Sequence, residues 1–121
     1  MDMTMFQDHT GGKWWKSEYG NAKVQSDYNY LLKYSPYHIV PNRKLPHTLV
    51  MTGDMDNRVV PSHSYKFAAK TQSLKNNPSQ TMLYTQRYGS HSPYSGGSRS
   101  VVEGMAVKWT FILQATSGAL D

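Results

Sequence analysis

Apolar side chains follow a helical spacing most clearly near the end of the chain. They recur there at i, i+1, i+4, i+5, i+8, i+11 and i+12, at Val101, Val102, Met105, Ala106, Trp109, Ile112 and Leu113. This 3.6-residue period predicts a helix with one apolar stripe. A weaker stripe over residues 22–33 predicts a second, shorter helix with Val24, Tyr28, Leu31 and Leu32 on one face. We expect it to end at Ser35-Pro36, because the residue before a proline avoids the helical region.

Two short, apolar and β-branched runs predict strands. Residues 48–52 lie between a proline-bounded linker, residues 41–46, and Gly53, which is typical of a buried strand. Residues 81–85 predict the second strand. Between them, Pro61 is suited to a first helical turn, and Asn76-Asn77-Pro78 ends the helix that we expect there.

The order strand, helix, strand, helix predicts a right-handed βαβ unit with a parallel sheet, and therefore an α/β fold. We assign this unit to residues 47–121, with a Ser-, Gly- and Tyr-rich loop over residues 86–98. Residues 1–46 form the preceding segment. Within it, residues 1–20 are interpreted as an ordered loop with one helical turn.

The supply of core residues is small for a chain of 121 residues. Only 38% are apolar and the mean hydropathy is −0.64, yet nine tyrosines argue against disorder. These values favour a piece of a larger domain.

Charge and cysteine content narrow the classes of partner. The net charge is +5, but the 13 Lys and Arg residues are scattered along the chain and no run of them forms a stripe, which indicates a solvated surface and no nucleic-acid partner. An RNA-binding fragment that stacks bases on its tyrosines is an alternative.

There is no cysteine, so disulfides and thiolate metal sites are excluded. No apolar run approaches the roughly 20 residues of a membrane span, and the first residues lack a signal-peptide pattern. We expect a cytoplasmic protein with no membrane contact and no cofactor.

Polar residues follow each predicted strand. Asp54, Asp56 and Arg58 come after the first strand, and His91 comes after the second. Functional side chains in open α/β sheets lie at the carboxyl ends of strands. An acid followed by a histidine is also the chain order of an α/β-hydrolase triad, in which the carboxylate orients the histidine that accepts the nucleophile's proton. On this pattern alone, a solvated carboxylate and a surface histidine are the alternative.

A serine nucleophile is not evident in the sequence. A nucleophile elbow reads Gly-x-Ser-x-Gly between a strand and a helix. The nearest match, residues 96–100 (Gly-Gly-Ser-Arg-Ser), lacks the final glycine, follows a loop and comes after His91. We interpret it as the N-cap region of the last helix, where serine is favoured.

Longer stretches carry a resemblance to a known family. Residues 30–36 (Tyr-Leu-Leu-Lys-Tyr-Ser-Pro) and 49–61 (Leu-Val-Met-Thr-Gly-Asp-Met-Asp-Asn-Arg-Val-Val-Pro) resemble the prolyl oligopeptidase family of serine peptidases. Residues 62–69 continue the match, and residues 1–3 and 10–20 are similar to that family too. The resemblance implies the C-terminal part of an α/β-hydrolase catalytic domain, incomplete in this chain.

The resemblance also implies roles for single residues. Asp56 would be the triad acid and His91 the triad base. Arg58 would bind a backbone carbonyl of the substrate peptide. Trp15 would stack on the substrate proline, and the same pocket would be lined by Tyr19 and Val59.

In the family, the nucleophile, the oxyanion-hole donors and a propeller domain precede the segment that matches Met1. The resemblance therefore implies a serine endopeptidase that cleaves short peptides after proline, with the serine missing from this chain. The chain would need the upstream part of the hydrolase domain as its partner. The alternative is a catalytically inactive truncated product or pseudo-enzyme that at most binds proline-containing peptides.

Overall fold

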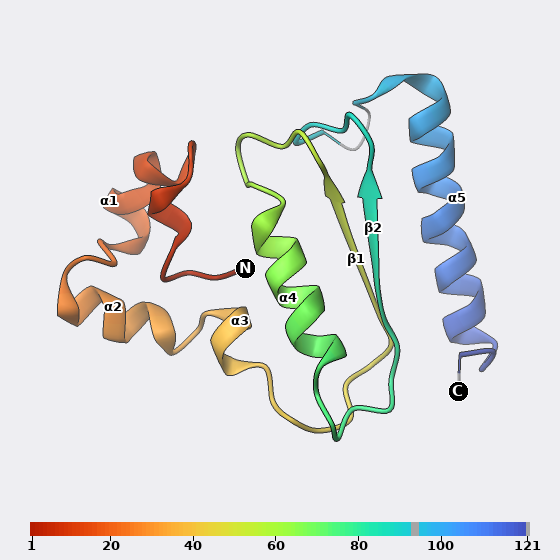
Figure 1. Cartoon of the computed structure of the whole chain (residues 1–121), viewed down its shortest axis with the longest axis horizontal. Coiled ribbons are helices and arrows are strands. Elements are labelled where there is room, and N and C mark those ends of the chain that lie inside the picture. Colours follow the sequence, from red (N-terminus) through yellow and green to blue (C-terminus); the bar gives the residue numbers. More distant parts are fainter. Residues whose placement is uncertain (93–94, 121) are drawn as a thin grey trace.

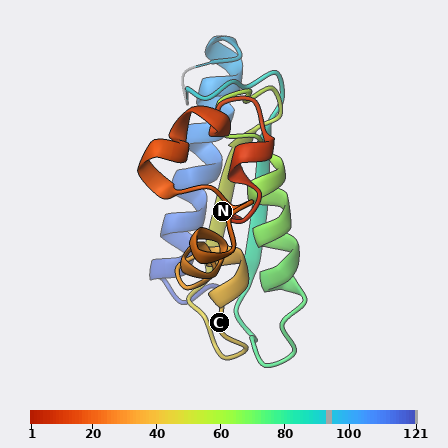
Figure 2. The ribbon, with the colours of Figure 1, turned by 90° about the vertical axis from the view of Figure 1, so that its left-hand side faces the viewer.

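The computed structural model describes residues 1–92 and 95–120, with a two-stranded parallel sheet between two helices (Figures 1 and 2). Strand β1 (Thr48–Gly53) pairs with β2 (Thr81–Gln86), and Thr48 lies opposite Thr81. Helix α4 (Ser62–Gln72) contacts both strands, whereas α5 (Gly97–Thr116) contacts β2. The predicted α/β class, element order and parallel pairing are confirmed.

The first 39 residues form a group of short helices beside α4 (Figure 1). They are η1 (Phe6–Asp8), η2 (Gly12–Trp15), α1 (Lys16–Tyr19), α2 (Gln25–Leu32) and α3 (Pro36–Ile39). A small hydrophobic core lies here: Met3, Phe6 and Leu31 are buried together, and Trp15 and Ala22 pack against them. The segment is therefore more helical than the single turn expected over residues 1–20.

Proline explains one element that the hydrophobic pattern did not predict. Helix α2 does end before Ser35-Pro36, as expected, but Pro36 then begins α3. Proline is favoured at this position because its missing N–H would have no partner in a first helical turn. The Ser35 backbone is extended, and its carbonyl accepts the first hydrogen bonds of the turn, from His38 and Ile39.

Two helix ends differ from the sequence prediction. Helix α4 ends at Gln72, before Asn76, because the Ser73 hydroxyl bonds the Lys70 carbonyl and competes with further helical bonds. Helix α5 begins at Gly97, and its N-cap is Gly96 in the left-handed region (φ 89°), with no side-chain cap. The expected serine cap is thus wrong. Residues 93–94 of the predicted loop lie outside the described residues.

Strand β1 is less buried than its sequence suggested. Its residues are mostly half-buried, and Met51 is 41% exposed. The reason is that α5 packs on β2, so one face of β1 opens into a cavity. Within the described residues, each strand pairs only with the other, which leaves an open edge on both.

None of the described helices is long and apolar enough to cross a membrane.

Candidate active site

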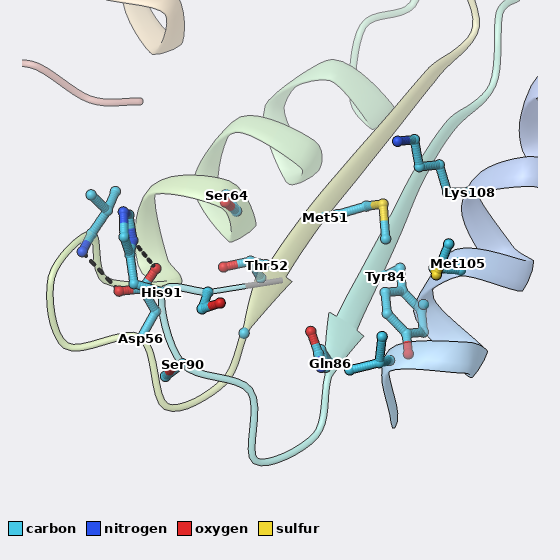
Figure 3. A pocket seen from close by; sticks show the side chains of 15 residues that line it. Met51, Thr52, Asp56, Ser64, Tyr84, Gln86, Ser90, His91, Met105 and Lys108 are labelled. Atoms are coloured by element: carbon cyan, nitrogen blue, oxygen red, sulfur yellow. Dashed lines mark hydrogen bonds and ion pairs between the residues drawn. The ribbon is translucent and has the colours of Figure 1, made fainter. Parts of the chain in front are cut away.

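Asp56 and His91 meet at the carboxyl end of the sheet. Asp56 lies in the loop after β1, and His91 lies in the loop after β2. Because the strands are parallel, both loops leave the sheet at the same end. The Asp56 Oδ2 and His91 Nδ1 atoms are 2.9 Å apart, as drawn in Figure 3. The fold therefore joins two side chains 35 positions apart in a hydrogen bond.

Asp56 is held by its own loop. Its side chain is 9% exposed, and Oδ1 accepts hydrogen bonds of 2.9 Å from the backbone N–H groups of Arg58 and Val59. Burial raises the pKa of this carboxyl, but the bonds from His91, Val59 and Arg58 outweigh it, so the net pKa lies below the ordinary value of 3.8. Asp56 is therefore an oriented carboxylate at neutral pH.

Close backbone contact keeps the two loops together. A Cβ atom on Gly53 would lie 2.3 Å from the Gly89 carbonyl oxygen and 2.7 Å from that of Ser90. The Met55 N–H also donates to the Gly89 carbonyl at 2.9 Å. Only glycine at position 53 lets the end of β1 approach the His91 loop this closely.

The His91 ring has one nitrogen committed to Asp56 and a side chain that is 47% exposed. With Nδ1–H donated to the carboxylate, Nε2 is the basic nitrogen. The pair can therefore accept a proton at Nε2 and stabilise the resulting imidazolium, as the acid and base of a triad do.

An open cavity of about 610 Å³ adjoins this pair. Asp56, His91 and Val59 line one part of it. Most of the rest is formed by the strands and by α5, including Met51, Tyr84, Met105 and Lys108, as Figure 3 shows. The cavity places apolar surface next to the candidate proton-transfer group.

The other predicted substrate-binding residues do not line this cavity. Trp15 packs against the core of the N-terminal segment. Tyr19 is 43% exposed, and its ring meets that of Phe6 edge to face at 5.7 Å. The Arg58 residue is exposed, and its backbone N–H holds Asp56. The structure thus joins Asp56, His91 and Val59, and leaves Trp15 and Tyr19 in the neighbouring segment.

Serines also line the cavity, and no sequence motif marked them. Ser64 lies on α4, and Ser90 directly precedes His91. The Ser90 backbone N–H donates a hydrogen bond to Ser95 Oγ at 2.6 Å within the same loop. Ser98 is the serine at the centre of the nearest match to a nucleophile elbow. It lies in the first turn of α5, after Gly96 in the left-handed region, and so belongs to the start of a helix. Among the described residues, no group of three or more His, Asp or Glu could hold a metal ion.

Comparisons with known proteins identify the family of this chain. A profile of the prolyl oligopeptidase family of S9 peptidases matches residues 1–118. The chain belongs to the prolyl oligopeptidase family. It is 37% identical over 120 residues to prolyl oligopeptidase A of Amanita bisporigera, covering 95% of this chain and 15% of that protein. It is 45% identical over 74 residues to the prolyl endopeptidase of Dictyostelium discoideum, covering 60% of this chain and 10% of that protein.

Solved structures of the family share the fold. One from a study of two prolyl endopeptidases matches with a TM-score of 0.78 and 32% identity, over 99% of this chain and 17% of its own. Unliganded prolyl oligopeptidase B of Galerina marginata matches with a TM-score of 0.73 and 34% identity, over 94% of this chain and 15% of its own. The chain thus spans about one-sixth of the length of the prolyl oligopeptidases that it matches.

Proposed function

We propose that this chain supplies the acid and the base of a serine endopeptidase that cleaves short peptides after proline. The observation that carries the proposal is the hydrogen bond between buried Asp56 and half-exposed His91 at the carboxyl end of the sheet. Family membership supports it, because the family consists of serine peptidases. The substrate complexes of the Galerina enzyme were solved with alanine in place of a serine, a histidine or an aspartate.

In this proposal each residue has one task. His91 Nε2 takes the proton from a serine hydroxyl as that oxygen attacks the peptide carbonyl, and later gives it to the leaving amine. Asp56 stays ionised, fixes the ring and stabilises the imidazolium. Arg58 binds a substrate carbonyl, since its guanidinium offers several donors in a fixed plane. Trp15, with Tyr19 and Val59, contacts the substrate proline.

The serine of this reaction belongs to another part of the hydrolase domain. Triad members act as a unit, so Asp56 and His91 without a nucleophile supply almost no triad catalysis. We therefore propose that the 121 residues need the remainder of that domain, which would also cover the open face of β1. The second candidate is a pseudo-enzyme that at most binds proline-containing peptides. The position of Trp15 and Tyr19 away from the cavity favours the inactive product, because the residues expected to bind the substrate proline do not line the cavity beside His91.

A chimera tests the proposal. Residues 1–118 would replace the matching segment of Amanita bisporigera prolyl oligopeptidase A, and hydrolysis of a chromogenic prolyl peptide would be followed. We expect the chimera to be active, and Asp56→Asn to lower kcat roughly 10⁴-fold, because the histidine then loses its oriented tautomer. Asp54→Asn, an exposed acid on the same loop, is the matched control and should keep activity.

The outcomes separate the two candidates. A chimera that melts like its parent but does not cleave the substrate indicates an inactive site and supports the pseudo-enzyme. The isolated chain should show no turnover. Turnover that disappears in His91→Ala would contradict the view that the nucleophile lies outside this chain.

A further inference from the structure

A buried polar cluster connects the first residues of the chain to α4. Asp2 is 2% exposed. Its carboxylate forms an ion pair with Lys66 and accepts hydrogen bonds from the Thr4 backbone and hydroxyl at 3.0 and 2.7 Å. Its backbone N–H points to His63 Nδ1 at 3.3 Å. One residue thus contacts two side chains of α4 that lie 61 and 64 positions away in the sequence.

The same cluster contains a serine, a histidine and an acid, but it is not a second triad. Ser35 Oγ lies 2.9 Å from His38 Nδ1, and that nitrogen is 3.7 Å from the Asp2 carboxylate. Ser35 is fully buried, and its oxygen accepts a hydrogen bond from the Met3 N–H at 2.9 Å. A substrate carbonyl cannot reach it, so the contacts of Ser35 are structural.

The cluster lies next to the loop that carries Asp56. Helix α4 begins at Ser62, directly after that loop, and His63 is in its first turn. A second set of contacts joins the two parts nearby. The Thr10 hydroxyl donates to the Asn57 carbonyl, and a Cβ on Gly11 would lie 2.7 Å from the Arg58 carbonyl oxygen. The N-terminal segment is therefore held at two places, at Asn57 and Arg58 in the loop and at His63 and Lys66 on α4.

Trp15 belongs to this segment. It packs against the buried cluster of Met3, Phe6 and Leu31, and Met3 directly follows Asp2 in the chain. A shift of Asp2 away from α4 would carry Met3, and with it Trp15, away from the loop of Asp56 and Arg58. The distance between the two halves of the proposed substrate site therefore depends on polar contacts outside that site.

We propose that Asp2, His63 and Lys66 form a clasp that positions the N-terminal segment, with Trp15, against the Asp56–Arg58 loop. These three are positioning residues, since none of them lines the cavity beside His91. The clasp itself rests on geometry, and its effect on substrate binding rests on the proposed function. His63 must be neutral in it, because Nδ1 accepts the Asp2 N–H. The groups facing His63 are the His9 ring at 5.2 Å, Lys66, Asp2 and the amino group of Met1.

Two lysines on one face of α4 allow a matched test. Lys66 and Lys70 both lie over the Tyr37 ring, at 4.5 and 4.8 Å, but the ion pair with Asp2 belongs to Lys66. Hydrogen exchange would be measured for Lys66→Met and Lys70→Met in the full-length chimera that carries residues 1–118 of this chain. We expect amides in residues 1–20 to exchange about tenfold faster in Lys66→Met, because the buried Asp2 carboxylate loses its ion-pair partner. Amides of β1 and β2 should be unchanged, and Lys70→Met should match the wild type.

Equal exchange in the two variants would overturn the clasp. So would faster exchange throughout the strands in Lys66→Met, since that would make Lys66 a general stability residue. A second pair tests His63: Gln offers an amide oxygen that can accept the Asp2 N–H, and Leu does not. We expect His63→Leu to loosen residues 1–20 and His63→Gln to restore most of their protection; identical behaviour would refute the hydrogen-bonding role. Exchange does not depend on catalysis, so an inactive chimera leaves this result unaffected.

Discussion

Single residues in this chain owe their chemistry to hydrogen bonds made by the backbone around them. Asp56 keeps its charge although its side chain is largely shielded from water, because two N–H groups of its own loop and His91 bind its two oxygens. A carboxylate satisfied in this way has a fixed direction as well as a lowered pKa. Its contribution to stability is present above the ordinary pKa of 3.8 and is lost as the pH falls through the lower value in the folded chain.

His63 makes stability depend on pH in a higher range. Burial, and then the nearby His9, lower its pKa from 6.5 to about 4. The unfolded chain therefore takes up the proton first as the pH falls below about 6.5, and the folded state is destabilised progressively down to about pH 4. Between pH 7 and pH 5 we expect the free energy of unfolding to fall by about 2 kcal/mol from this group.

Urea denaturation at the two pH values measures this effect. Asp2 and Asp56 have pKa values below 3.8 and remain ionised over that range. In His63→Gln the fall should be smaller by the same amount, because glutamine does not titrate. An unchanged pH dependence in this variant would mean that His63 is not the responsible group.

At the scale of elements, close packing of the two loops that carry Asp56 and His91 depends on one glycine. Gly53→Ala would place a methyl group against the carbonyls of residues 89 and 90, and we expect it to cost roughly 1–3 kcal/mol of unfolding free energy. Gly104→Ala is the control. Its Cβ would meet Tyr84 at 3.6 Å, an ordinary contact, inside α5, so we expect a gain of roughly 0.5–1 kcal/mol from helix propensity.

Chemical denaturation of both variants gives these free energies, and the imidazole N–H signal of His91 in proton NMR reports the bond to Asp56. That signal should be lost in Gly53→Ala and kept in Gly104→Ala. If Gly53→Ala is as stable as the wild type and keeps the signal, the approach of the loops is not what holds Asp56 and His91 together.

For the whole molecule, the amount of apolar surface left exposed to water is the main factor that limits stability and solubility. Buried apolar side chains in the described residues are few: Met3, Phe6, Leu31 and Ala68. Meanwhile one face of α5 exposes Val102, Met105, Trp109 and Leu113 by more than half of their surface. Exposed apolar stripes and open strand edges favour self-association. The isolated chain should therefore be marginally stable and prone to aggregate.

Light scattering against protein concentration tests this expectation. The double variant Trp109→Glu, Leu113→Glu should scatter less than the wild type, because it removes two exposed apolar side chains. Thr110→Glu, Gln114→Glu adds two acidic residues at exposed polar positions of the same helix and controls for the change in charge. An equal reduction in both variants would assign the effect to charge. A cooperative, reversible melt of a wild-type monomer would contradict the expectation of marginal stability.

The sequence by itself determined the order of the helices and strands and the candidate residues of the functional site. Helical periodicity, β-branched runs and proline positions depend on neighbours a few residues apart, so α5, β1, β2 and the start of α4 could be predicted. The stretch around Asp56 and Arg58 indicated the family. Helix ends were less predictable at Ser73 and Gly96, where a side-chain bond and a left-handed glycine act locally.

Only the tertiary structure decided which distant groups meet. The Asp56–His91 bond needs two parallel strands in register and a glycine at the end of β1. The contacts of Asp2 with His63 and Lys66 need the N-terminal segment to fold back on α4. The half-exposure of β1 follows from α5 covering its neighbour. No local pattern encodes such contacts, because they arise from the packing of whole elements against one another.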